Sequence, residues 1–145
     1  MRTADSRSVG APPPDASALG AWHKAAWCLV ALLGASAVAL GAYAAHGMAA
    51  WADQAAVATV NTAVRYQMWH TLALSGALVW QQCAPQMRLC PVIALWLCGT
   101  AAFSGSLYAL AFTELAVGLI TPLGGLLLIT GWLALGVAAL RAKAD

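Results

Sequence analysis

The stretch "AAWCLVALLGASAVALGAYAA", Ala25 to Ala45, contains no charged residue and decides the fold class of this chain. A helix rises about 1.5 Å per residue, so an apolar run of this length crosses a hydrocarbon core of roughly 30 Å. The run ends in "AYA", which resembles a signal-peptide cleavage site. It is much longer than the ~7–15 residues of a signal-peptide apolar region, however, so we predict a retained membrane span over residues 25–45.

The composition extends this prediction to most of the chain. Of the 145 residues, 62% are hydrophobic and only 8% are charged, and the mean hydropathy is +0.76. A soluble domain carries roughly 25% charged residues, so most of this surface must face a lipid bilayer. The net charge is +2 and the basic residues are dispersed, which gives no indication of a nucleic-acid partner.

Three further apolar segments follow, over residues 64–80, 92–112 and 119–140. We therefore predict an all-α fold: an integral membrane four-helix bundle over residues 22–145 whose short connections make antiparallel helical hairpins. Residues 46–63, "HGMAAWADQAAVATVNTA", predict a short amphipathic helix at the membrane interface anchored by Trp51, with an ordinary loop as the alternative. Residues 1–21, rich in Pro, Ser, Ala and Gly, predict a disordered cytoplasmic tail.

The basic residues predict the orientation of the spans in the membrane. An even number of crossings places six of them on one side: Arg2, Arg7, Lys24, Arg88, Arg141 and Lys143. The other side keeps only Arg65, together with Asp53 and Glu114. Because basic residues are enriched in cytoplasmic segments, we predict that both termini are cytoplasmic.

Several polar side chains lie in or near the predicted spans, where ionisable groups are costly and often functional. Depth along the spans predicts that they gather in the outer half of the membrane as one polar cluster: His46, Arg65, Tyr66, His70, Ser104, Ser106 and Tyr108. A hydrolase interpretation has His70 activating Ser104, and a metal or haem interpretation uses His46 and His70 as ligands.

A structural interpretation of the polar cluster is favoured. Ala102 stands where a G-x-S-G protease motif has its first glycine, and no third metal ligand is evident. Interhelical hydrogen bonds are the common fate of such groups in membranes. Arg65 is expected to reach the outer headgroups or to pair with Glu114. We accordingly predict no catalytic residue, no metal and no cofactor.

Small residues predict where the helices pack. Small side chains let two helix backbones approach closely, and we expect this of Gly34, Gly41, Ala101, Gly105, Gly124 and Gly125. Ser104 and Ser106 flank Gly105, and their hydroxyls are expected to bond to carbonyls of the preceding turn. The four cysteines have no metal-ligand or redox spacing, so we interpret them as structural or incidental.

Four segments carry a family resemblance: "LGAYAAHGM" (residues 40–48), "YQMWHTLAL" (66–74), "AFSGSLYAL" (102–110) and "ITPLGGLLLITGW" (120–132). The chain resembles the domain of unknown function 423 family of small four-span inner-membrane proteins, which is related to transmembrane protein 256-like proteins. The resemblance covers residues 25–140, and Tyr43 stands where Phe is more usual. It implies a multi-pass protein of the bacterial plasma membrane with no assigned activity. The motif residues that carry over are His46, Tyr66, His70, Ser104, Gly105, Ser106, Tyr108, Thr121, Pro122, Gly124 and Gly125.

These observations predict a non-enzymatic membrane protein. We expect an accessory or scaffold subunit that contacts the lipid bilayer and either a membrane-protein partner or further copies of itself through its Gly and Ala faces. The alternative is a small transporter or channel whose path is lined by the polar cluster. An intramembrane hydrolase is the most distant interpretation.

Overall fold

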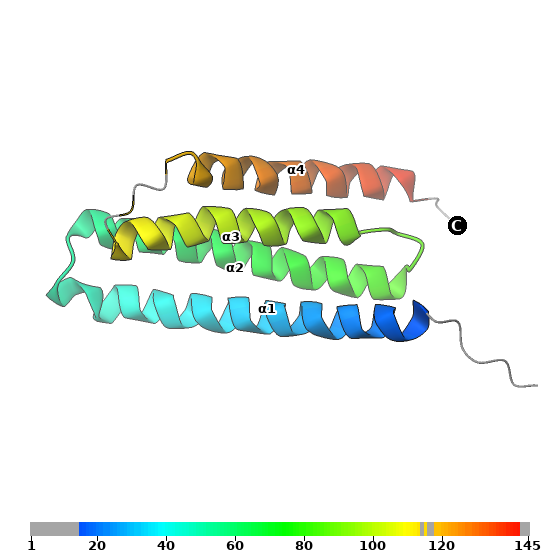
Figure 1. Cartoon of the computed structure of the whole chain (residues 1–145), viewed down its shortest axis with the longest axis horizontal. Helices are drawn as coiled ribbons and strands as arrows, with labels where there is room; N and C mark the ends of the chain where they lie inside the picture. Colours follow the sequence, from blue (N-terminus) through cyan, green and yellow to red (C-terminus); the bar gives the residue numbers. More distant parts are fainter. Residues whose placement is uncertain (1–14, 114, 116–117, 143–145) are drawn as a thin grey trace, which may run out of the picture.

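The computed structural model describes residues 15–113, 115 and 118–142. Along the chain these form α1 (Asp15–His46), a single 3₁₀ turn η1 (Met48–Ala50), α2 (Gln54–Cys83), α3 (Cys90–Phe112) and α4 (Ile120–Arg141), as Figure 1 shows. The described part of the chain is all-helical, as predicted, and each predicted span lies in one of the long helices, except that the fourth begins at Leu119, one residue before α4. Three of these, α1, α3 and α4, are long and apolar enough to cross a membrane.

The helix α1 begins earlier than expected. Residues 15–21 are helical, so the prediction of a disordered tail is wrong over this part, while residues 1–14 lie outside the described residues. The sequence explains the boundary. Three prolines end at Pro14, and proline is not tolerated inside a helix. The following residues "ASALGAW" are rich in Ala and Leu, which are strong helix formers.

The prediction of a separate interfacial helix is also wrong. Residues 54–63 form the first turns of α2, which continues without a break to Cys83. Asp53 starts this helix, because its carboxylate accepts a hydrogen bond from the Ala56 N–H at 2.7 Å. Only η1 separates α1 from α2, and in it Met48 is fully buried. The exposed Trp51 donates its indole N–H to the Tyr43 hydroxyl at 3.0 Å.

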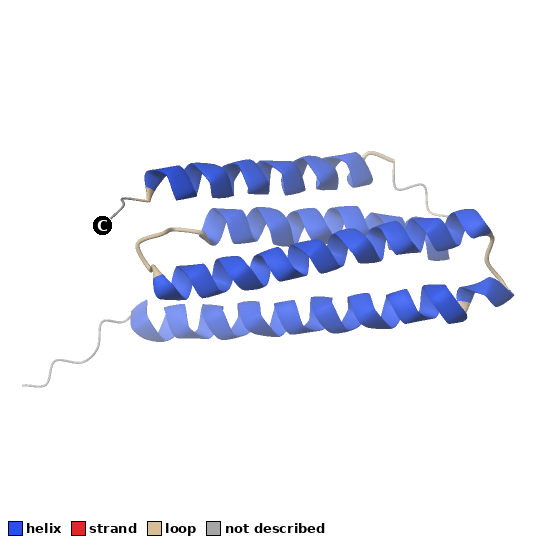
Figure 2. Cartoon of the chain, turned by 180° about the vertical axis from the view of Figure 1, so that it is seen from behind, coloured by secondary structure: helices blue, strands red, loops and turns tan. Residues whose placement is uncertain are grey.

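The helices are arranged in space in the order in which they occur in the sequence. The backbone of α1 packs on α2, α2 packs on α3, and α3 packs on α4. Figures 1 and 2 both show α1 and α4 on opposite sides of the central pair, α2 and α3. A closed four-helix bundle also packs its first helix on its last. In the described residues α1 and α4 do not meet, so the predicted bundle is an open array.

The core of this array lies along α2 and α3. Its largest fully buried side chain is Trp96, at 1% exposure, and it packs with Leu74, Leu78, Ile93 and Leu128. A second small cluster joins Ala44, Met48 and Val60 near the end where α1 meets α2. The outer helices instead keep exposed apolar side chains, among them Leu32, Val38, Leu126, Leu133 and Leu140.

Candidate functional site

The structure separates the residues that were predicted to form one polar cluster. His46 is exposed at the last residue of α1, and Arg65 is exposed on α2. Glu114 lies outside the described residues, so its pairing with Arg65 stays a prediction. Tyr66 and His70 line one groove, whereas Ser104, Ser106 and Tyr108 belong to three other contacts between helices.

The first of these contacts joins three helices through Gln67. Its amide nitrogen Nε2 donates to the Leu33 carbonyl and to the Ser36 hydroxyl of α1, both at 2.8 Å. Its Oε1 accepts from the Tyr108 hydroxyl of α3, also at 2.8 Å. Gln67 is 4% exposed, and these bonds use both amide protons and the amide oxygen. Our sequence interpretation missed Gln67 and Ser36; an amide inside an otherwise apolar segment was the available signal.

The two serines of α3 face different neighbours. Ser104 donates to the Ala63 carbonyl of α2 at 2.9 Å. Ser106 lies 2.9 Å from the Phe103 carbonyl and 2.7 Å from the Thr121 hydroxyl of α4. A separation of two residues corresponds to a rotation of about 200° around the helix axis, so the two serines reach helices on nearly opposite sides of α3. The Ser104 proton is directed to a backbone carbonyl, and the arrangement is not that of a Ser–His dyad.

The predicted role of Gly105 in helix packing is wrong within this chain. A side chain added at Gly105 would meet nothing within 4 Å, and Ala101, one turn earlier, is exposed as well. Both residues face outward, because the surfaces of α3 that contact α2 and α4 lie to either side of them around the helix. Four of the other predicted positions do lie at helix contacts: Gly34, Gly41, Gly124 and Gly125.

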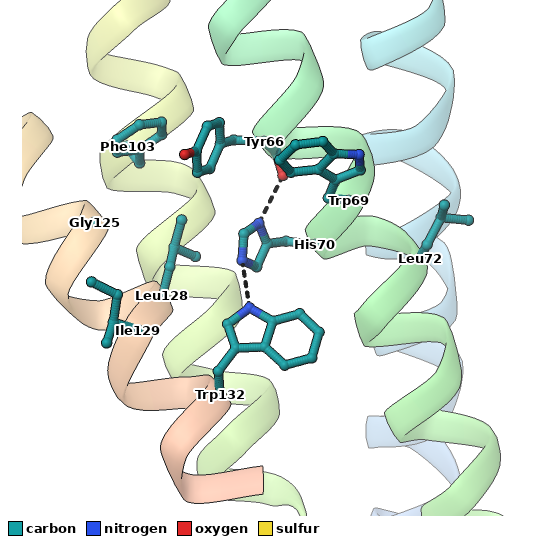
Figure 3. A pocket seen from close by; sticks show the side chains of 9 residues that line it. All are labelled: Tyr66, Trp69, His70, Leu72, Phe103, Gly125, Leu128, Ile129 and Trp132. Atoms are coloured by element: carbon teal, nitrogen blue, oxygen red, sulfur yellow. Dashed lines mark hydrogen bonds between the residues drawn. The ribbon is translucent and has the colours of Figure 1, made fainter. Parts of the chain in front are cut away.

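His70 connects α2 with α4. Its Nδ1 lies 2.8 Å from the Tyr66 carbonyl, and its Nε2 lies 3.1 Å from the indole Nε1 of Trp132, as Figure 3 shows. An indole N–H only donates and a carbonyl oxygen only accepts. These bonds therefore assign the His70 proton to Nδ1 and make Nε2 the acceptor. Since the Nε2 lone pair is engaged by Trp132, it is directed neither to a metal nor to Ser104.

A groove with a volume of about 510 Å³ lies beside His70. α2 and α4 form its two sides and α3 contributes Phe103 between them (Figure 3). Aromatic and aliphatic side chains line it: Tyr66, Trp69, His70, Leu72, Phe103, Leu128, Ile129 and Trp132, together with Gly125. The Tyr66 and Phe103 rings lie with their centroids 4.6 Å apart. We take this groove as the candidate functional site, because it is the described cavity that contains motif residues predicted from the sequence.

The metal interpretation gains no support from the described residues. His46 ends α1, whereas His70 lies in the middle of α2 and faces α4. Within the described ranges no three His, Cys, Asp or Glu side chains lie close enough to hold a metal ion. The four cysteines are unpaired and exposed.

Apolar helices of membrane-spanning length, in which Gln67 and Ser104 bond to neighbouring helices, define a small α-helical membrane protein. Comparison with known proteins gives its family. The model of the family described as "Protein of unknown function (DUF423)" matches residues 40–125, and the chain belongs to this family.

Three relatives illustrate the similarity. A "UPF0382 membrane protein" of Haemophilus influenzae is 44% identical over 117 residues, covering 79% of this chain and 93% of the relative. The "UPF0382 inner membrane protein YgdD" of Escherichia coli K12 is 36% identical over 115 residues, covering 73% of this chain and 82% of the relative. A UPF0382 membrane protein of Staphylococcus epidermidis is 40% identical over 116 residues, covering 78% of this chain and 93% of the relative. No solved structure matches the chain.

Proposed function

We propose that this chain is a four-span inner-membrane protein with both termini in the cytoplasm, acting as a non-enzymatic accessory or scaffold subunit. The observation that carries the proposal is that polar side chains of this chain bond to neighbouring helices. Gln67, Ser104, Ser106 and His70 each bond to a neighbouring helix, and they do not face a common space. Such bonds hold helices together and leave the apolar outer surfaces of α1 and α4 to meet lipid or a partner.

The helix α2 serves as the fourth span in this proposal, although its hydropathy is the lowest of the four long helices. It lies between α1 and α3 and packs on both, so neighbouring helices shield its polar side chains from lipid. Gln67, His70 and Thr71 are each 4% exposed. The described hydrogen bonds of these three groups satisfy their polar atoms inside the protein. A polar group satisfied in this way is compatible with the hydrocarbon core.

The orientation rests on the described basic residues. Lys24 lies in the first third of α1, Arg88 lies between α2 and α3, and Arg141 ends α4. Figure 1 shows the start of α1, the connection between α2 and α3 and the end of α4 at the same end of the array. Arg88 and Arg141 line one small pocket there. Asp53, which begins α2, lies at the opposite end. The relative from Escherichia coli is named an inner-membrane protein, which supports the choice of membrane.

A topology experiment distinguishes a protein with four membrane spans from one with three. We expect green fluorescent protein fused after the last residue to fluoresce and alkaline phosphatase at the same place to be inactive, because the C-terminus is cytoplasmic. The same reporters fused at the N-terminus should give the same result, whereas phosphatase inserted after Trp51 should be active. If α2 does not cross, the two termini lie on opposite sides of the membrane, and the reporters at the two ends will disagree.

The scaffold role predicts a protein neighbour on an outer helix. We expect a photo-crosslinking amino acid at Leu133 of α4 or at Leu32 of α1, both about two-thirds exposed, to give one discrete protein adduct in intact cells. The matched control position is Leu110 of α3, an exposed apolar residue on a central helix. An adduct of twice the chain mass identifies a second copy.

Two results would contradict the accessory role. One is crosslinking to lipid alone at both outer positions. The other is solute flux through the purified protein in liposomes that is lost in Arg65→Ala, which would instead support a transporter. Labelling of Ser104 by a fluorophosphonate would contradict the non-enzymatic assignment.

A further inference from the structure

The groove between α2 and α4 lies at a depth that only a membrane-soluble molecule reaches. His70 is about 24 Å from the start of α2 at 1.5 Å per residue, which is near the middle of this helix. The groove is open at its rim, where Trp69, Leu72, Ile129 and Trp132 are each about half exposed or more. In the four-span arrangement this rim faces hydrocarbon, so the occupant enters from the bilayer. The volume of about 510 Å³ falls within the usual range of ligand pockets.

Two polar atoms of the lining side chains have no hydrogen-bond partner among the described residues, the Trp69 indole nitrogen and the Tyr66 hydroxyl. Both ring nitrogens of His70 are engaged, and the indole N–H of Trp132 donates to one of them. Figure 3 shows the Trp69 indole nitrogen pointing away from Trp132, and the Tyr66 hydroxyl pointing toward Phe103 inside the groove. Among the residues that the structure describes, none hydrogen-bonds the Tyr66 hydroxyl. A phenol without a partner is costly in hydrocarbon, so this hydroxyl favours an occupant with a hydrogen-bond acceptor.

The walls of the groove favour a flat occupant. Tyr66, Trp69, Phe103 and Trp132 present aromatic rings to it, and flat rings pack against such walls in offset or edge-to-face geometry. A phospholipid acyl chain has neither a ring nor an acceptor at this depth. Leu72, Leu128 and Ile129 provide an aliphatic surface beside the rings.

We propose that the groove between α2 and α4 binds the ring of a lipid-soluble quinone, with the Tyr66 hydroxyl donating to a ring carbonyl and the hydrocarbon tail lying along the aliphatic side chains. A quinone combines the three required properties: a flat ring, carbonyl acceptors and an apolar tail. The proposal concerns binding alone and includes no electron transfer. It rests on the four-span arrangement proposed above, but not on which partner the outer helices contact.

The test uses the full chain in mild detergent with decylubiquinone as the probe. Quinones quench indole fluorescence, and Trp69 and Trp132 line the groove, so we expect saturable quenching. Tyr66→Phe removes only the hydroxyl and should weaken the apparent affinity about fivefold, as expected for one hydrogen bond. Tyr43→Phe is the matched control, because this hydroxyl bonds to Trp51 outside the groove, and it should leave the affinity unchanged.

A second pair of variants blocks the groove. A side chain at Gly125 would make only ordinary contact with the Phe103 ring, at 3.7 Å, so Gly125→Leu is expected to fold and to remove the saturable quenching. Gly136→Leu lies on the same helix with nothing within 4 Å and is its control. Thermal unfolding checks that each variant is folded. If Gly125→Leu does not fold, the affinity of Tyr66→Phe alone tests the proposal. The proposal is overturned if Tyr66→Phe binds as wild type does, or if decylbenzene, which has the same tail and no carbonyl, competes equally well.

Discussion

Gly124→Ala is expected to destabilise the protein by about 1–3 kcal/mol, the usual cost of overpacking a close contact. The added methyl group would clash with the Phe103 amide nitrogen and would lie 2.8 Å from the Phe103 Cα and 2.9 Å from the Ala102 carbonyl carbon. These are backbone atoms of α3, so no side-chain rotation relieves the clash. The helix α4 must move away from α3, which weakens the most extensive helix contact in the array. Unfolding by sodium dodecyl sulfate, followed by circular dichroism, measures the loss.

Gly136→Ala is the matched control for this prediction. It is the same substitution on the same helix, but nothing lies within 4 Å of the added methyl group. Because Ala favours a helix over Gly, we expect no loss of stability there. Equal effects of the two substitutions would show that α3 and α4 do not approach as closely as described.

The second large effect is expected at Gln67. Gln67→Met keeps the length of the side chain and removes its bonds to Leu33, Ser36 and Tyr108. Interhelical hydrogen bonds in membranes contribute roughly 0.6–2 kcal/mol each, so we expect a loss of about 1–3 kcal/mol in the same unfolding measurement. Part of this loss arises because the Tyr108 hydroxyl is left without its acceptor.

Two further variants show whether the Gln67 bonds are the cause. Gln82→Met, near the exposed end of α2, changes the same chemical groups outside the helix contacts and should be neutral. Tyr108→Phe removes one partner, and its effect should not add fully to that of Gln67→Met, because both remove the same bond. Full additivity would contradict the network that joins α1, α2 and α3.

The existence of the helices could be predicted from the sequence, whereas the orientation of their faces could not. Long apolar runs and short connections indicate spans and antiparallel neighbours whatever the details of packing. In a membrane helix the lipid face and the protein face are both apolar, so periodicity does not distinguish them. This is why Gly105, unlike Gly124, makes no helix contact within this chain, and a contact with a partner or another copy stays a prediction.

The candidate site could be predicted only in part for a related reason. Tyr66 and His70 share one face of a helix by their spacing, and both line the groove. Trp132 is the partner of His70 from α4, and nothing local in the sequence indicates that α4 supplies it. Gln67 was overlooked because a single amide in an apolar segment resembles a span boundary. The same ambiguity led to the prediction of a separate interfacial helix where α2 is continuous.

The open order of the helices has a consequence for biosynthesis. Each long helix packs on the helix made just before it, and the described residues show no packing between the first and the last. Contacts between elements that are near in sequence form rapidly, because little chain must be closed into a loop. Each helix can therefore dock on its predecessor as soon as it is made, without waiting for the C-terminus. A nascent chain that ends before Ile120 should already hold α1, α2 and α3 together, with α4 added last.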